Sequence, residues 1–166
     1  GRGGGLVKVG RGTLILAGAN SYPGGTTVSG GTLQGNTTSL QGNIVNNAVV
    51  AFGQSGNGTY AGNMSGSGAL TVTGGGNVTL SGTNTYAGGT TVSAGTLTGT
   101  TTSVQGAITN NAAVVFDQAT SGTYAGVMSG TGALTKTGSG TVMLTDDNSY
   151  GGGTTVNAGV LIGNSL

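Results

Sequence analysis

The sequence lacks cysteine, histidine and tryptophan, and among its 166 residues it has only four basic and three acidic side chains. Without cysteine and histidine, the chain has no zinc finger, thiol nucleophile, Ser-His-Asp triad or disulfide. The three acidic residues are all aspartate, which leaves little for a pair of catalytic carboxylates or a calcium cage. We therefore expect no enzymatic activity, no cofactor and no bound metal.

Positive charge and long apolar runs are also scarce. The basic residues Arg2, Lys8, Arg11 and Lys136 are scattered, so they cannot form the clustered basic surface of a nucleic-acid-binding protein. No run of about 18 apolar residues is present, so we expect no membrane insertion by this segment. The first residues, GRGGG, resemble neither an initiator methionine nor a signal peptide, and we interpret the chain as part of a longer protein.

An internal repeat organises what is present. Residues 6–69 align without a gap to residues 70–133, with 39 of 64 positions identical, and residues 134–166 begin a third, partial copy. A disordered glycine-rich linker has no reason to keep such register, because only a stacked structure is disturbed by a single insertion. We therefore expect residues 1–166 to form one folded segment of repeated units.

Short apolar runs within each copy indicate strands. Thr13 to Leu16, Thr26 to Val28 and Ala48 to Phe52 are rich in Val, Leu, Ile and Thr and are bounded by Gly, Asn and Ser. None has the length or the 3.6-residue period of a helix. The expected fold is all-β.

The spacing of these runs predicts the coil length. Val28, Val50, Val72 and Val92 lie 22, 22 and 20 residues apart, which gives about three coils of about 21 residues per copy. Coils of this length form a parallel β-solenoid, in which each strand pairs with its equivalent one coil on. At about 4.8 Å per coil, the chain would form a rod of about eight coils.

Two sets of residues carry the expected interior. Leu14, Leu16, Val28, Leu33 and their equivalents should point inward. The pairs Asn46-Asn47 and Asn110-Asn111 suggest left-handed corners and amide ladders along the axis.

Residues 10–35, GRGTLILAGANSYPGGTTVSGGTLQG, carry the most regular motif. It recurs at residues 74–99 and 138–163. This pattern resembles the autotransporter-associated β-strand repeat, also called the passenger-associated transport repeat. The resemblance implies a right-handed parallel β-helix, exported by the type V pathway of Gram-negative bacteria and located at the bacterial surface or outside the cell. Pro23 and Asp146-Asp147 depart from the pattern but fall at or beside turns.

Aromatic and hydroxyl side chains of the motif are candidates for surface contact. They are Tyr22, Tyr86, Tyr150, Thr26, Thr90 and Thr154. The tyrosines could stack on sugar rings of a host or matrix glycan, but a structural role, in which each ring covers a turn, is the favoured interpretation.

Threonine arrays raise the further alternative of an ice-binding face. The sequences Thr71-Val-Thr73, Thr96-Leu-Thr98 and Thr135-Lys-Thr137 have the outward Thr-x-Thr form. They occur about once per copy, so the face should be interrupted.

Asp146, Asp147 and Asn148 form the only acidic cluster. It could supply part of a calcium site, but the equivalent turns of the other copies lack the acids. A solvated turn and a metal-independent fold are the favoured interpretation.

Together these features predict a non-enzymatic stalk segment of an autotransporter passenger that supports secretion-coupled folding and adhesion or self-association. Its expected partners are flanking coils of the same polypeptide, further copies packed side by side or end to end, and a glycan. End-to-end stacking is expected because no capping sequence is visible at either end of the repeat. The alternative function is a glycan- or ice-binding β-solenoid module.

Overall fold

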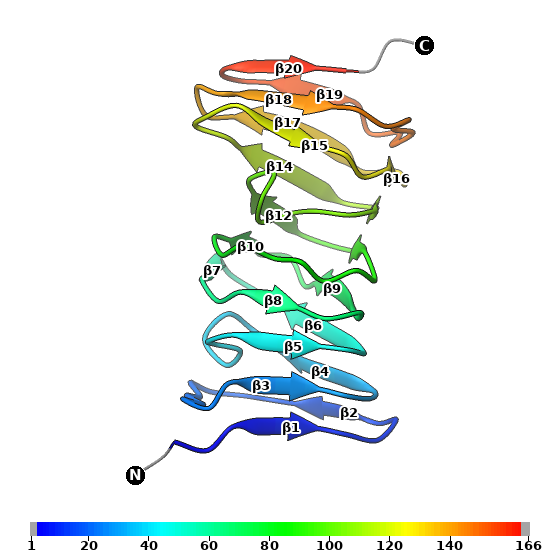
Figure 1. The fold of residues 1–166 in the computed structure, drawn as a ribbon. Coiled ribbons are helices and arrows are strands. Elements are labelled where there is room, and N and C mark those ends of the chain that lie inside the picture. Colours follow the sequence, from blue (N-terminus) through cyan, green and yellow to red (C-terminus); the bar gives the residue numbers. More distant parts are fainter. Residues whose placement is uncertain (1–2, 164–166) are drawn as a thin grey trace.

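The computed structural model describes residues 3–163 as a stack of parallel strands with no helix among them. The chain rises in coils with three sides, and the amino-terminal and carboxy-terminal ends lie at opposite ends of the rod (Figure 1). The strands at the front of Figure 1 run left to right while the chain climbs from its N-terminus, so the solenoid is right-handed. The all-β, right-handed solenoid expected from the sequence is confirmed.

Each side of the solenoid is a column of short strands. Side 1 contains β1 Leu6–Lys8, β3 Thr26–Val28, β5 Ile44–Asn46, β8 Met64–Ser65, β15 Gly122–Tyr124, β18 Thr141–Leu144 and β20 Val160–Ile162. Side 2 contains β2 Thr13–Ile15, β4 Thr32–Gly35, β6 Val49–Gly53, β9 Ala69–Thr73, β11 Thr90–Val92, β13 Ile108–Asn110 and β16 Met128–Ser129. Side 3 contains β7 Gly58–Tyr60, β10 Asn77–Leu80, β12 Thr96–Gly99, β14 Ala113–Asp117, β17 Ala133–Thr137 and β19 Thr154–Val156.

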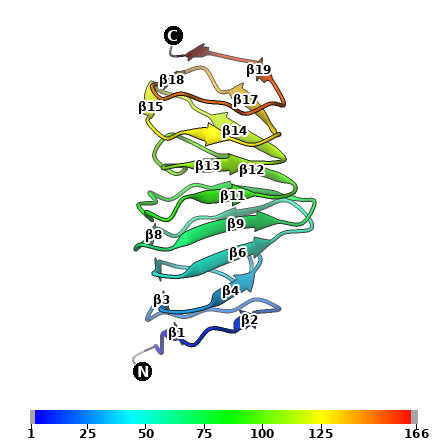
Figure 2. The same cartoon turned by 90° about the vertical axis from the view of Figure 1, so that its right-hand side faces the viewer.

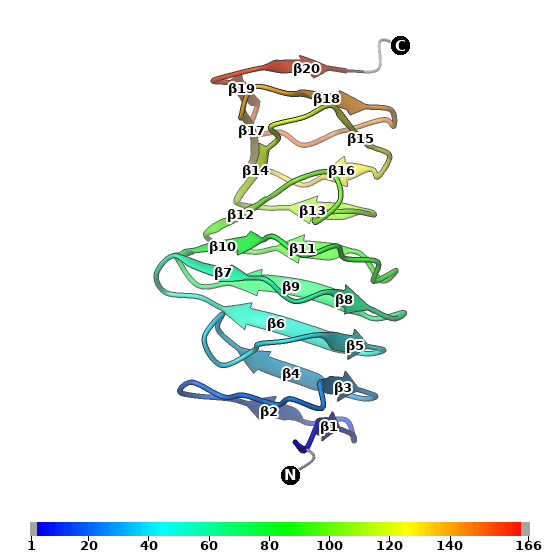
Figure 3. The ribbon, with the colours of Figure 1, turned by 60° about the vertical axis from the view of Figure 1, so that its left-hand side comes forward.

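Side 1 is interrupted between β8 and β15, where two coils cross it as loops. The loops remain hydrogen bonded to the column, because Thr85 N donates to Met64 O at 2.8 Å and Asn84 N donates to Thr102 O at 3.3 Å. The stack therefore continues through this region, as Figures 2 and 3 show from two other directions.

The 64-residue repeat does not correspond to a whole number of three-sided coils. Along side 1, Leu6 pairs with Thr26, Thr26 with Ile44, and Ile44 with Met64, so three coils end at Met64. The second copy begins six residues later at Leu70, which lies in β9 on side 2. Each copy thus spans three coils plus one side, and equivalent residues of successive copies move to the next side.

This offset corrects part of the register expected from the valines. Val72 pairs with Val92 as expected. Val28, however, pairs with Asn46, and Val50 pairs with Leu33 and Leu70. The physical reason is that these coils have 18 or 20 residues and not 22, so Val28 in β3 lies on side 1 whereas Val50 in β6 lies on side 2.

The interior consists of one or two apolar side chains per strand. Val28 and Leu33 are fully buried, which confirms the inward direction expected for them. Leu14 and Leu16 are only half-buried in the first coils, whereas their second-copy equivalents Val78 and Leu80 are buried. Aromatic pairs thicken the core, with ring centroids 5.4 Å apart for Phe52 and Tyr60 and 5.3 Å apart for Phe116 and Tyr124.

The interpretation of the asparagine pairs as left-handed corners and stacked ladders is wrong. In residues 3–163, every positive φ belongs to glycine. Asn46 and Asn110 lie on different sides, and each is fully buried and bonded to the backbone of the next coil: Nδ2 of Asn46 donates to Ala69 O at 2.8 Å. The amides therefore join coils to one another by capping backbone groups.

Candidate binding surfaces

The Asn-x-Tyr-x-Gly-Gly motif forms a tight corner that clamps neighbouring coils. Asn84 is 1% exposed, its Oδ1 accepts from Met64 N at 2.7 Å, and its Nδ2 donates to Ser103 O at 2.8 Å. One side chain therefore joins the coils below and above. Sequence analysis missed this role, although the Asn that precedes each motif tyrosine was the available signal.

The two glycines of the corner are each required for a different physical reason. Gly89 has φ +78°, a conformation that other residues rarely adopt. Gly88 lies so close to the coil below that an added Cβ would be 2.6 Å from the carbonyl carbon of Gly68. The Gly-Gly pair of the motif is thus explained by the close stacking of one coil on the next.

The motif tyrosines differ in exposure. Tyr86 is 4% exposed and its hydroxyl lies 2.7 Å from Thr90 Oγ1, while Tyr150 makes the same contact with Thr154 in a half-exposed setting. Burial raises the pKa of Tyr86 to about 12, and the hydrogen bond with Thr90 acts in the opposite direction. In the central copy, therefore, the ring and hydroxyl are used inside the solenoid.

The motif threonines follow the same trend. Thr26 and Thr90 are buried, whereas Thr154 is exposed in one of the last coils. In the second and third copies, the tyrosine and the threonine of the motif lie in hydrogen-bond contact. The threonines of the three motifs, however, lie on three different sides of the solenoid. A common contact surface made of all six residues stays a prediction.

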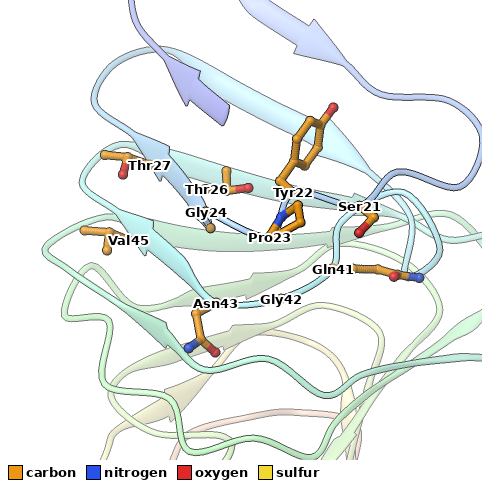
Figure 4. Close-up of a pocket in the computed structure, with 11 residues that line it drawn as sticks. Ser21, Tyr22, Pro23, Gly24, Thr26, Thr27, Gln41, Gly42, Asn43 and Val45 are labelled. Carbon is orange, nitrogen blue, oxygen red and sulfur yellow. The ribbon is translucent and has the colours of Figure 1, made fainter. Parts of the chain in front are cut away.

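A cavity of about 570 Å³ lies beside the first motif, between the segment Ser21–Thr27 and the segment Gln41–Val45 (Figure 4). Tyr22 and Thr26 contribute to its lining, and none of its lining residues carries a formal charge. In Figure 4 the Tyr22 ring points away from Gln41 and Asn43. The cavity could accept an uncharged ligand through hydroxyl, amide and backbone groups.

A nearly continuous column of outward β-branched residues runs along side 3. We call it the threonine ladder; in pairing order it comprises Thr59, Thr79, Thr98, Val115, Thr135 and Thr155. Val115 breaks the run of threonines, and the other residues of the Thr-x-Thr form, Thr96 and Thr137, pair with Ala113 and Asp117, so the interrupted face expected from the sequence is confirmed. Because successive copies are rotated by one side, threonines from different positions of the repeat line up in one column.

The two described lysines do not contribute to the surface charge. Lys136 is fully buried, and its Nζ donates to the carbonyl groups of Thr137, Gly138 at 2.8 Å and Ala158 at 3.3 Å. Lys8 is 7% exposed and donates to three carbonyl groups, among them Gly30 O at 2.8 Å. Arg2 lies outside the described residues.

The exposed charges of residues 3–163 are few. They are Arg11, Asp117, Asp146 and Asp147. Long stretches of each side therefore carry hydroxyl, amide and methyl groups alone.

The acidic turn is exposed and is organised by Asn148. Asn148 Nδ2 donates to Asp146 O at 2.7 Å, and Asn148 Oδ1 accepts from Met128 N at 2.7 Å. Within residues 3–163, no three side chains of the His, Cys, Asp or Glu type gather into a group suited to a metal ion. Like Asn84, Asn148 joins its coil to the coil below, but its Nδ2 bonds within its own turn. Metal independence stays a prediction. In the same span, no helix is long and apolar enough to cross a membrane.

These features define a class: a right-handed parallel β-solenoid of tandem 64-residue repeats. The model of the passenger-associated-transport-repeat family matches residues 6–34, 70–98 and 134–162, just over half of the chain. The chain belongs to this family.

A curated relative gives a second comparison. The adhesin BmaC autotransporter of Brucella suis biovar 1 (strain 1330) is 41% identical over 162 residues, covering 79% of this chain. The chain spans about 5% of that relative's length. No solved structure shows significant similarity.

Proposed function

We propose that this chain is a non-enzymatic stalk segment of an autotransporter passenger displayed at the bacterial surface or released from it, where it supports adhesion. The observation that carries the proposal is the threefold family match at a 64-residue interval, together with a relative named as an autotransporter adhesin. The fold supports it, because stacked coils around a thin apolar core extend the described residues as a rod.

Adhesion is tested by retention on cells. Beads coated with the folded 166-residue protein are expected to be held on epithelial monolayers more strongly than beads coated with an unrelated β-solenoid. Equal retention of both bead types would contradict the adhesin proposal.

Secretion-coupled folding is a second part of the proposal. Each coil hydrogen bonds mainly to the coils directly before and after it, so an existing coil offers a template for the next. Folding can then proceed from one end as chain becomes available. Pulsed hydrogen exchange during refolding tests this, since protection should spread between adjacent coils and simultaneous protection of all strands would contradict it.

Self-association side by side is supported by the threonine ladder. A flat column with no charged member offers little electrostatic repulsion to a second copy. The double variant Thr98→Lys/Thr135→Lys should lower the sedimentation coefficient of any assembly, whereas Thr71→Lys/Thr91→Lys on side 2 is the matched control. If both double variants lowered the sedimentation coefficient equally, the threonine ladder would be excluded as the contact between copies.

End-to-end association is supported by the inward apolar side chains of the first and last described coils. Leu14 and Leu161 are only half-buried, whereas their pairing partners Leu33 and Val142 are fully buried. Leu14→Lys and Leu161→Lys should shorten assemblies without affecting lateral contacts. The alternative function, an ice- or glycan-binding module, uses the same threonine ladder or the motif tyrosines.

A further inference from the structure

Two grooves of the same construction lie one repeat apart. The first, of about 230 Å³, is lined by residues that include Gln41, Gly42, Thr59 and Ala61. The second, of about 320 Å³, is lined by residues that include the equivalents Gln105, Gly106, Thr123 and Ala125. Because the pairs are 64 residues apart, the grooves belong to the repeat itself.

A missing strand creates each groove. In the 18-residue coil between Thr26 and Ile44, a turn replaces the side 3 strand, closed by a hydrogen bond from Leu40 N to Asn36 O at 2.9 Å. The second copy repeats the turn in place of a side 1 strand, with Val104 N donating to Thr100 O at 2.9 Å. The turn cannot continue the strand ladder, so the next coil is left partly uncovered.

Neighbouring side chains hold each turn in place. Gln54 Oε1 accepts from Thr37 N at 3.0 Å, and Gln118 Oε1 accepts from Thr101 N at 2.9 Å. An added Cβ on Gly58 would lie 1.9 Å from Thr37 Oγ1, so glycine is needed for this close approach. The grooves are thus fixed features of the fold.

A strand edge forms one wall of each groove. β7 is the terminal strand of its sheet, and so is β15. Tyr60 O accepts from Ser81 N in the coil above at 3.1 Å. Alternate residues of a parallel strand face opposite neighbours, so the N–H and C=O of Thr59 point down into the groove. Thr123 has the same position, because Tyr124 O accepts from Thr145 N at 3.2 Å.

The polar groups at the groove can both donate and accept hydrogen bonds. They are the strand-edge backbone, the exposed hydroxyls of Thr59 and Thr123, and the amides of Gln41 and Gln105. Exposed Ala61 and its equivalent add an apolar patch beside them. None of the residues that line either groove carries a formal charge.

This chemistry matches one class of ligand. A charged group would lose hydration without gaining a counter-charge. An added peptide strand would need a longer edge than the three residues of β7 or β15, and a turn crosses below each edge. Sites for drug-sized ligands occupy about 300–1,000 Å³, and grooves of about 230 and 320 Å³ lie below or at the lower end of that range, so they suit a small ligand with hydroxyl groups and a C–H face.

We propose that the two grooves bind single uncharged pyranose units of a glycan, one in each 64-residue copy. The inference deepens the adhesin proposal and rests on it. The copies are offset by three coils and one side, so the sites are about 16 Å apart along the axis and face different directions. They therefore bind independently, with two sugars per 166-residue chain.

The test is an NMR titration of the isotope-labelled chain. The probes are neutral hexose, N-acetylhexosamine and deoxyhexose oligosaccharides up to about 10 mM, with a uronic-acid oligomer as the charged comparison. At least one neutral sugar should shift the amide signals of Thr59 and Thr123 while the uronic-acid oligomer does not. Absence of shifts with every neutral probe, or shifts confined to other segments, overturns the inference.

Paired variants assign the sites. Gln41→Leu/Thr59→Val should remove binding at the first groove and leave one sugar per chain, and Gln105→Leu/Thr123→Val should do the same for the second. The groove-filling variants Ala61→Phe and Ala125→Phe change exposed positions and should each weaken their site by about tenfold or more. Ser55→Ala/Thr83→Val, at exposed positions outside both grooves, is the control.

The outcomes separate the two proposals. If groove variants bind sugar as well as the unmodified chain, the groove inference fails, whatever the beads do on cells. If the unmodified chain binds neutral sugar at the grooves but coated beads are not retained, the inference about the grooves holds and the adhesin proposal fails.

Discussion

Asn110 donates from its side-chain amide to the backbone carbonyl group of Ala133, 23 residues further on, at 2.9 Å. Its Oδ1 also accepts from Ala112 N at 3.2 Å, and the side chain is fully buried. Asn46 makes the same pair of contacts one repeat earlier. This relationship ties the end of one strand to the next coil through a side chain that is itself removed from water.

The first prediction follows from these buried bonds. Asn110→Ala leaves the part-buried C=O of Ala133 and N–H of Ala112 without partners, so it should lower the free energy of unfolding by about 1–3 kcal/mol. Urea denaturation followed by circular dichroism measures the change. The matched control is Asn111→Ala, at the exposed neighbour, where a change within about 0.5 kcal/mol is expected. Equal losses in both variants would contradict the role given to Asn110.

The second prediction concerns shared packing. Val28 is fully buried and pairs with Lys8 below and Asn46 above, so Val28→Asp should cost about 3 kcal/mol or more and disturb both neighbouring coils. Hydrogen exchange should quicken in β1, β3 and β5 together. The outward neighbour Thr27→Asp should leave exchange in β5 unchanged. Quickening confined to β3 in Val28→Asp would contradict shared packing.

The third prediction is a loss of stability in alkali. The pKa of Tyr86 is raised by burial from 10.0 to about 12 in the folded chain, so the unfolded chain releases this proton at lower pH. The contribution of neutral Tyr86 is complete below about pH 10 and declines as pH rises towards 12, by up to about 1.4 kcal/mol per pH unit. Urea midpoints measured between pH 8 and 12 should fall less steeply for Tyr86→Phe. Identical pH profiles would remove Tyr86 as a source of the effect.

The fourth prediction is that the fold does not depend on metal. Asn148 bonds to the backbone of Asp146 in the acidic turn and to that of Met128 in the neighbouring coil, and Asp146 and Asp147 are exposed. EDTA should therefore leave the melting temperature unchanged, and added calcium should not raise it. A substantial decrease with EDTA, absent in Asp146→Asn/Asp147→Asn, would identify a metal site at this turn.

The sequence predicts the strands and the core better than it predicts the register. Alternation of apolar and small polar residues places Val28 and Leu33 inside, because each strand has one buried face. Register depends on coil length. The 18-residue coil results from the turn after Asn36, and the spacing of apolar residues in the sequence does not predict this turn. This coil is four residues shorter than the expected spacing of 22, and it pairs Val28 with Asn46 and not with Val50.

The binding surfaces are less predictable, since they depend on which side a residue reaches. Tyr86 and Tyr150 have the same local motif but different exposure, because coverage by neighbouring coils differs. The grooves beside Thr59 and Thr123 depend on a strand missing from the coil below. Neither property is local, so the spacing of residues within one motif cannot supply it.

The direction of the ladder hydrogen bonds has a mechanical consequence. In a stack of coils these bonds lie along the rod, so a pull on its two ends opens them coil by coil and does not shear them all at once. A coil of 20 residues, such as that from Ile44 to Met64, adds about 5 Å to the rod when folded but about 70 Å of chain when peeled away. Under flow, a stalk built in this way would lengthen in steps and limit the tension that reaches the attachment at its tip.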